Sequence, residues 1–218
     1  MASCAGGYWP VGVCLRGGFA GAEGTAYNRA MAMVKPPFVS RAGEKLAAAL
    51  DAFELDVRGL TCADFGCNVG GFTDCLLKRG AAGVHAVDTG YGELAWTLRN
   101  DPRVTVMERT NALHCEPPTA VDLVVIDTAW TPQERIVPAA GRWLAPGGQT
   151  VSLLKPHYEL AKLERRRSPA ALSDAEAMRV CRTVCERLGK LGFAPSAAMR
   201  SPLRGKGGNV EFLLLIHT

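Results

Sequence analysis

A glycine-rich stretch over residues 60–74 constrains the fold of this chain more than any other feature of the sequence. An apolar run comes first, three glycines follow it, and a helical pattern begins directly after them. This order predicts a buried strand, a tight turn and the start of a helix. The free backbone N–H groups at such a helix start can bind a carboxylate or a phosphate.

The spacing of the three glycines is G-x-x-x-G-G, which differs from the G-x-G-x-x-G of a dinucleotide-binding turn. This spacing is common in sites for S-adenosylmethionine (SAM), so the turn predicts a site for that cofactor. Glycine lets the backbone approach a ligand closely. A glycine turn with no ligand is the alternative interpretation. The residues expected to line the site are Asp64, Gly66, Cys67, Asn68, Gly70, Gly71 and Phe72, together with Asp127 from a later strand end.

Strand and helix patterns alternate along the rest of the chain, which predicts an α/β fold with a mostly parallel sheet and helices on both faces. A hairpin near Gly205–Gly208 would make the last strand antiparallel to its neighbours. One helix is expected over about 41–53, capped by Ser40, and another after the capping box at Ser173 and Glu176. The later strands are expected over 83–88, 104–107, 121–127, 150–154, 194–199 and 210–216.

Charged residues fall at the expected strand ends, where ligands bind in parallel sheets. Asp88 closes the second strand, a place from which an acid typically accepts both hydroxyls of an adenosine ribose. Asn111 follows the third strand and is placed to contact the adenine. A turn acid ahead of Thr89 and an ordinary loop asparagine are the respective alternatives.

A second group of charges comes from distant parts of the chain. Two acids and a lysine are expected at the end of the sheet where the parallel strands finish. A second lysine, beside the apolar stripe of the first helix, can reach the same cleft. The alternative is a solvated helix lysine whose stem covers apolar surface. Buried charges persist only when paired, so the group is either a structural ion-pair network or a reaction centre. Its members are Lys45, Asp127, Lys155 and Glu211.

Methyl transfer from a sulfonium needs a nucleophile held in line and close to the carbon. A ribose 2′-hydroxyl becomes a good nucleophile when a base removes its proton, and Lys155 is the predicted base. Lys45 would favour the developing alkoxide. The two carboxylates, Asp127 and Glu211, would orient the lysines and balance their charge.

Composition narrows the class of protein. A chain of 218 residues with 48% apolar residues can form one α/β domain with a full core, and a net charge of +4 permits nucleic acid as a partner. No apolar run of about 18 residues occurs, so no membrane span is expected. The eight cysteines lack C-x-x-C pairs and the histidines do not cluster, so we expect reduced thiols, no metal site and a cytoplasmic location.

Residues 1–34 show no periodicity, and we expect a disordered leader or a stretch ahead of the true start of translation, followed by one domain over 35–218. Several segments of that domain together match one family pattern. They are residues 38–46, 64–77, 86–92, 94–96, 101–104, 107–111, 154–156 and 208–213, among them Leu154-Lys155-Pro156 and Gly208-Asn209-Val210-Glu211.

With these segments the chain resembles the FtsJ-type ribose 2′-O-methyltransferases, most closely the TlyA (haemolysin A) branch. The resemblance implies the SAM-dependent methyltransferase fold, with a Rossmann-like seven-stranded sheet whose last strand is antiparallel. It also implies 2′-O-methylation of RNA, usually ribosomal RNA. The Lys-Asp-Lys-Glu tetrad of that family falls here on Lys45, Asp127, Lys155 and Glu211.

The chain also departs from the family pattern. The small RNA-binding domain that precedes the Ser-Arg segment in the TlyA branch has no counterpart in residues 1–34. After Asp127, where the family usually has a Ser-Phe pair, this chain has Thr128-Ala129-Trp130. After Lys155-Pro156, where the family usually has Gln-Phe-Glu, it has His157-Tyr158-Glu159. A run that includes Arg165-Arg166-Arg167 replaces a glycine-rich loop and is either a phosphate track or a solvated loop. These differences border the substrate side of the expected site.

Two rival functions stay open at this point. A non-catalytic protein that keeps the fold and binds SAM and RNA would also fit the altered loops. A methyltransferase acting on another substrate is the other possibility. Trp130 and Tyr158 flank the expected centre and either stack on an unpaired base or pack against the protein.

Overall fold

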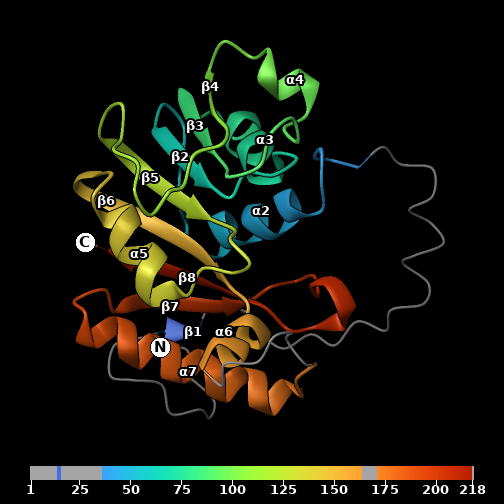
Figure 1. The fold of residues 1–218 in the computed structure, drawn as a ribbon, viewed down its shortest axis with the longest axis vertical. Helices are drawn as coiled ribbons and strands as arrows, with labels where there is room; N and C mark the ends of the chain where they lie inside the picture. The colour runs from blue at the N-terminus through green and yellow to red at the C-terminus, as the bar shows by residue number, and fades with distance from the viewer. Residues whose placement is uncertain (1–13, 16–35, 164–170, 218) are drawn as a thin grey trace.

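The computed structural model describes residues 14–15, 36–163 and 171–217, which form one mixed sheet between two layers of helices (Figure 1). The strand order is β1-β7-β8-β6-β5-β2-β3-β4. The strands are β1 (Cys14–Leu15), β2 (Thr61–Phe65), β3 (Gly83–Val87), β4 (Val104–Met107), β5 (Val121–Ile126), β6 (Leu144–Leu154), β7 (Pro195–Arg200) and β8 (Phe212–His217).

The sheet confirms the predicted fold class. Strand β8 runs antiparallel to both β6 and β7, and the other pairs are parallel. The seven-stranded sheet is therefore β2 to β8, and β1 adds a two-residue strand beside β7 at its edge. Apart from Cys14 and Leu15, the expected leader lies outside the described residues.

Apolar stripes on the helices pack against both faces of the sheet. One core cluster joins α2, α3 and the residues before and within α4 to the sheet, and the other joins α5 and α7 to its opposite face. No helix among the described residues is long and apolar enough to cross a membrane. The helices are α2 (Ala42–Ala52), α3 (Gly71–Lys78), α4 (Trp96–Arg99), α5 (Gln133–Gly141), α6 (Pro156–Leu163), α7 (Asp174–Lys190) and the 3-10 turn η2 (Lys206–Gly208).

Element ends account for most differences from the sequence-based expectations. Strand β6 begins at Leu144, well before the expected start, because Leu144 pairs with Val121 and the chain continues through Gly147 despite its turn-like sequence. Leu191 is 50% exposed because α7 ends one residue earlier, at Lys190. The capping box that begins α7 is as predicted.

The glycines of the β2–α3 turn are required by the protein's own packing as well as by any ligand. Gly66 has a φ of +85°, and a Cβ there would lie 2.7 Å from the backbone oxygen of Asp127. A Cβ on Gly71 would collide with Ser40 Oγ and lie 2.9 Å from Ala42 Cβ. The start of α2 therefore crosses the start of α3 at a distance that only glycine permits.

Replacing Gly71 by alanine is expected to lower the free energy of unfolding by about 1–3 kcal/mol, because the new methyl group pushes α2 away from α3. Gly189→Ala in α7 is the matched control. A Cβ there meets Ala194 Cβ at an ordinary 3.7 Å, so this change should stabilise the protein by up to about 1 kcal/mol. Urea unfolding measures both, and equal effects would contradict the packing argument.

Candidate functional site

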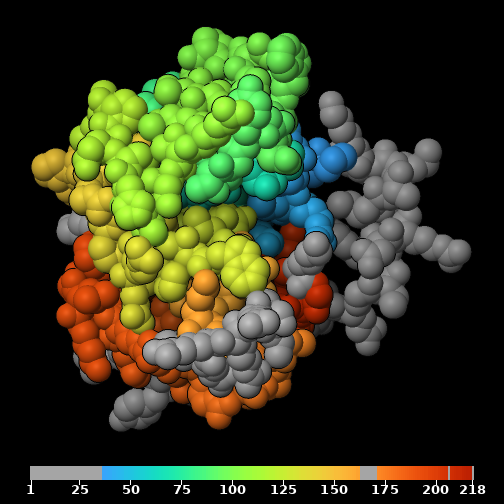
Figure 2. All heavy atoms as spheres, in the orientation of Figure 1, coloured from blue at the N-terminus to red at the C-terminus, as the bar shows by residue number. Residues whose placement is uncertain are grey.

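Two adjoining cavities lie at the carboxyl ends of the parallel strands. The first has a volume of about 240 Å³ and the second about 360 Å³. Both are lined by Gly66, Asn68, Asp127 and Ala129, so they form neighbouring parts of one trough. Figure 2 shows the surface hollowed where the green, blue and yellow segments meet. The combined size suits a ligand larger than an amino acid.

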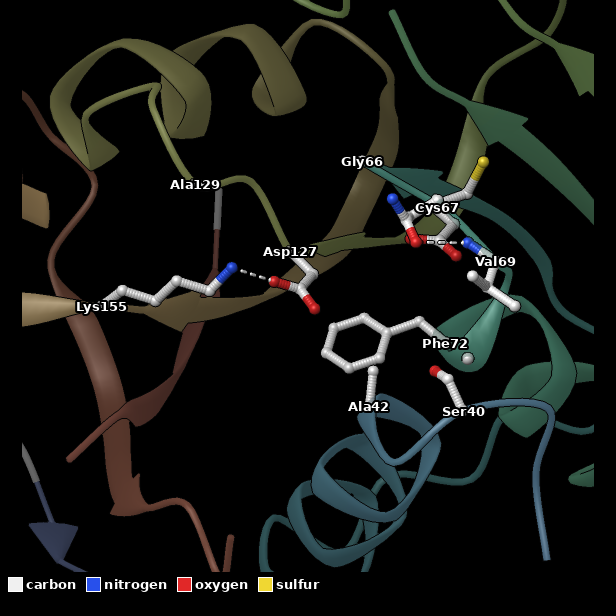
Figure 3. A pocket seen from close by; sticks show the side chains of 12 residues that line it. Ser40, Ala42, Gly66, Cys67, Val69, Phe72, Asp127, Ala129 and Lys155 are labelled. Atoms are coloured by element: carbon white, nitrogen blue, oxygen red, sulfur yellow. Dashed lines mark hydrogen bonds and ion pairs between the residues drawn. The ribbon is translucent and has the colours of Figure 1, made fainter. Parts of the chain in front are cut away.

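The trough is lined by most of the predicted cofactor residues. The first cavity is lined by Asp64, Gly66, Cys67, Asn68, Gly71, Phe72, Asp127 and Lys155, several of which Figure 3 shows facing one space. The second is lined by Asp88 and Asn111 together with Asp127. Gly70 lines neither cavity. Its φ is +99°, and a Cβ there would collide with the side chain of Leu98.

Ser40 lines the first cavity and does not cap α2 as predicted. The cap residue of α2 is Arg41, without a side-chain cap hydrogen bond, so the prediction of a Ser40 cap is wrong. Ser40 Oγ instead faces the place of the missing Gly71 side chain, and the residue lines the first cavity with Ala42. No motif in the sequence marked this contact, since it depends on how α2 crosses α3.

Asp64 presents a buried hydrogen-bond acceptor to the first cavity. Its Oδ2 accepts hydrogen bonds from Thr73 N at 2.9 Å and Thr73 Oγ1 at 2.7 Å, while the buried Oδ1 has no hydrogen-bond partner among the described residues. Burial raises the pKa of Asp64 to about 7, against the hydrogen bonds from Thr73 and assisted by the charge of Asp127. A ligand ammonium would satisfy this oxygen, so the cavity fits the amino-acid end of SAM.

Asp88 and Asn111 combine a loop-building contact with a place on the second cavity. Asp88 accepts hydrogen bonds from Asn68 N at 2.9 Å and Gly90 N at 2.7 Å, so it shapes the turn as the alternative interpretation expected. Each carboxylate oxygen retains a further lone pair that a ribose hydroxyl can use. Asn111 Oδ1 accepts a hydrogen bond from Leu113 N at 3.0 Å, and the residue lines the cavity as well.

Two short ion pairs join the four charged residues that the sequence singled out. Lys155 Nζ lies 2.5 Å from Asp127 Oδ1 beside the first cavity (Figure 3). Lys45 Nζ lies 2.5 Å from Glu211 Oε2. Glu211 is 3% exposed and the other three side chains 12–20%. These charges are held by α2 and by three neighbouring strands, and each lysine has an acid as its partner.

The sheet register explains why the two pairs lie near each other. Leu154 is paired with Phe212 in the antiparallel ladder of β6 and β8. Lys155 follows Leu154 and Glu211 precedes Phe212, so both continue the ladder past its last pair. The antiparallel last strand thus brings an acid from its start to the edge where the other strands end.

A buried polar network lies behind Asp127, and no sequence motif predicted it. Glu159 Oε1 accepts a hydrogen bond from Gln133 N at 2.9 Å, at the first residue of α5. The Gln133 side chain accepts from Ser152 Oγ at 2.6 Å and donates to the oxygen of Leu153 at 3.3 Å. Lys155 and Glu159, four residues apart, therefore hold the two ends of the loop between Asp127 and Gln133.

Comparisons with known proteins identify the family of this chain. The family model described as FtsJ-like methyltransferase matches residues 38–217. The chain belongs to the FtsJ-like methyltransferase family. Within this family it is 41% identical to the 16S/23S rRNA (cytidine-2′-O)-methyltransferase TlyA of Mycobacterium tuberculosis over 83% of this chain and 69% of that protein. It is 33% identical to Hemolysin A of Brachyspira hyodysenteriae over 81% and 75% of the two chains.

Solved structures support the same family and fold. A structure described as a putative hemolysin from Streptococcus thermophilus matches with a TM-score of 0.77 and 34% identity, over 85% of this chain and 69% of that one. The N-methyltransferase NodS in complex with S-adenosylhomocysteine matches at 15% identity with a TM-score of 0.58, which shows the shared fold alone. The predicted cofactor, SAM, agrees with the family and with the fold. The described residues hold no cluster of His, Cys, Asp or Glu suited to a metal.

The affinity for S-adenosylhomocysteine is expected to rise roughly tenfold between pH 6 and pH 8, because Asp64, whose pKa is about 7, becomes a charged acceptor for the ligand ammonium. Asp64→Asn should bind more weakly with little pH dependence. Asp122→Asn, which changes an exposed acid, is the control and should follow the unmodified protein. Calorimetry measures all three, and a pH-independent affinity in the unmodified protein would contradict this role.

Glu159 is expected to make folding stability depend on pH. Burial raises its pKa from an ordinary 4.5 to about 7. The stability that protonated Glu159 contributes to the fold is therefore fully present below pH 4.5 and is lost as pH rises through 7. Glu159→Gln keeps the acceptor and cannot ionise. Its free energy of unfolding relative to the unmodified protein should therefore increase by about 2 kcal/mol from pH 5 to pH 8. Glu186→Gln, on the exposed face of α7, should show no such trend.

Proposed function

We propose that this protein transfers a methyl group from SAM to a ribose 2′-hydroxyl of ribosomal RNA. The observation that carries the proposal is the Lys155–Asp127 ion pair in the wall of a cavity that fits the cofactor. Family membership supports methyl transfer. The name of the M. tuberculosis relative, an rRNA (cytidine-2′-O)-methyltransferase, supports RNA and the 2′ oxygen as the target.

We assign the two ends of the cofactor to different residues of the trough. Asp64 would receive the amino group in the first cavity, while Asp88 and Asn111 would hold the ribose and adenine in the second. The turn residues Cys67 and Asn68 would line the space between. When bound, SAM supplies a methyl group activated by a positively charged sulfur.

The four charged residues then act as the family's Lys-Asp-Lys-Glu tetrad. As the ribose oxygen gains its methyl group, the unprotonated amine of Lys155 accepts the proton of the 2′-hydroxyl and becomes an ammonium that Asp127, its ion-pair partner, holds in place. Lys45 stabilises the negative charge that develops on the ribose oxygen, and Glu211 orients Lys45. Once Lys155 carries that proton, the two lysines and the two carboxylates together have no net charge, which lowers the cost of holding them in a mostly buried place.

Two aromatic side chains beside the Lys155–Asp127 pair, the exposed Trp130 and the half-buried Tyr158, suit an RNA substrate, and we call them the aromatic platform. Trp130 is 54% exposed and lines the second cavity, and its ring centroid lies 4.9 Å from that of Tyr158. Lys162 Nζ lies 5.4 Å from the Trp130 ring. Such a platform can stack an unpaired base next to the target ribose. The predicted phosphate track at residues 165–167 lies outside the described residues.

A non-catalytic protein that binds SAM and RNA is the second candidate, which the altered loops favour. The structure argues for the enzyme, since the loops still bring Asp127 and Lys155 to 2.5 Å. A methyltransferase for a different substrate would need no exposed aromatic platform of this kind. We place the enzyme in the cytoplasm with the ribosome or its RNA as partner.

Incubation with tritiated SAM and total ribosomal RNA tests the proposal. Label is expected in 2′-O-methylnucleosides after digestion to nucleosides. Label in a base, or no label under conditions where SAM binds, would contradict it. Synthetic RNA with a single 2′-deoxy substitution at the mapped position should accept no methyl group, because it lacks the acceptor oxygen.

Lys155→Ala is expected to reduce methyl transfer by about 10²–10⁴-fold through loss of the base, while the affinity for SAM changes little. Lys190→Ala, an exposed lysine at the end of α7, is the matched control and should retain full activity. Single-turnover kinetics and calorimetry measure the two quantities. Full transfer by the Lys155 variant would exclude this lysine as the base.

A further inference from the structure

Two arginines and one acid form a cluster beyond the Lys45–Glu211 pair. Arg200 Nη2 lies 2.7 Å from Asp174 Oδ2, and Arg204 Nη2 lies 3.2 Å from Asp174 Oδ1. We call these three residues the arginine cluster. Two guanidinium groups share one carboxylate, so one positive charge is left over. The side chains are 35%, 52% and 50% exposed for Arg200, Arg204 and Asp174, and a ligand can reach them.

The register of the sheet and the loop after β7 place this cluster next to the proposed reaction centre. Leu154 pairs with Phe212, and Phe212 pairs with Arg200 on its other side. Ser201 N, the next residue along, donates a hydrogen bond to the oxygen of Glu211 at 2.9 Å. Figure 1 shows β6, β8 and β7 side by side, and Arg200 is one residue out of register with Glu211, on the face of the sheet that Phe212 shares with α7. The loop after β7 reaches the reaction centre itself, because a Cβ on Gly205, the residue after Arg204, would collide with Glu211 Oε1.

The loop that carries Arg204 has a defined shape. Arg204 Nη1 donates a hydrogen bond to the oxygen of Gly208 at 2.9 Å, and Gly205 N donates to the oxygen of Asn209 at 2.9 Å. Ser201 Oγ donates to the oxygen of Leu203 at 2.7 Å. Since these contacts fix the loop, less side-chain freedom is lost when Arg204 binds a ligand.

We propose that the arginine cluster binds a phosphate of the RNA strand next to the target nucleotide. This inference rests on the proposed function. The planar guanidinium fork matches phosphate oxygens, and two forks that converge on one acceptor in the free protein can converge on a phosphate in the same way. Asp174 then occupies the place of the phosphate until RNA binds. The strand would run from the aromatic platform past Lys155 and Glu211 to this cluster.

A purely structural role is the competing explanation, because the same ion pairs fasten the start of α7 to the end of β7. Substituting the arginines and substituting the aspartate of these ion pairs distinguishes the two explanations. Arg200→Gln with Arg204→Gln removes the cations, while Asp174→Asn breaks the same ion pairs and leaves both cations in place. A structural role predicts the same loss from both changes. A phosphate site predicts opposite effects on RNA binding.

The test measures binding of a fluorescent single-stranded RNA of mixed sequence from 50 to 300 mM KCl, together with methyl transfer to total ribosomal RNA. For the double arginine variant we expect about tenfold weaker binding. We also expect the slope of log Kd against log salt to fall by about 0.7 for each phosphate that the variant no longer neutralises. Asp174→Asn should bind as tightly as the unmodified protein or more tightly. SAM affinity should be unchanged in both, which also shows that they fold.

The matched control is Arg103→Gln. It breaks a similar exposed ion pair with Asp101 just ahead of β4, the outermost strand on the side of the sheet away from β7. It should leave RNA binding unchanged. Equal loss from Arg103→Gln, equal loss from Asp174→Asn, or no effect of the double variant would overturn the phosphate site. If the unmodified protein methylates no RNA, the proposed function itself has failed, whereas a methylating protein with an indifferent cluster contradicts this inference alone.

Discussion

The ion pair between Lys155 and Asp127 is the contact on which the rest of the site depends. Both residues follow the ends of parallel strands and line the first cavity, the proposed cofactor site. Their separation is fixed by the β5–β6 ladder and by Glu159, which holds the far end of the loop after Asp127. Removing either charge would leave the other partly buried without a partner, which costs several kcal/mol. The pair therefore stabilises the same geometry that the proposed reaction uses.

Much of this arrangement was predictable from the sequence. Strand and helix periodicity gave the α/β fold, because each element buries one stripe or face. The rule that ligands bind at the carboxyl ends of parallel strands pointed to Asp64, Asp88, Asp127 and Lys155 before any contact was known. The glycine hairpin predicted the reversed last strand, which the structure confirms and which explains the position of Glu211.

The parts that the sequence did not predict depend on contacts between elements far apart in the chain. Serine is a residue type that often caps a helix, but the crossing of α2 and α3 turns Ser40 toward the cavity. The Glu159–Gln133 contact joins residues 26 positions apart, and no local pattern marks it. Asp174 and Arg204 come together only because α7 begins beside the end of β7. Their placement follows from the order of strands.

The proposed reaction requires the methyl donor and the amine of Lys155 to face the same ribose oxygen. A crystal structure of the protein with S-adenosylhomocysteine measures this directly. We predict that the sulfur atom lies at the Asp127 end of the first cavity and faces Lys155 Nζ, with room for one ribose oxygen between them. A sulfur atom that faces away from Lys155, or a ligand outside the trough, would contradict the account.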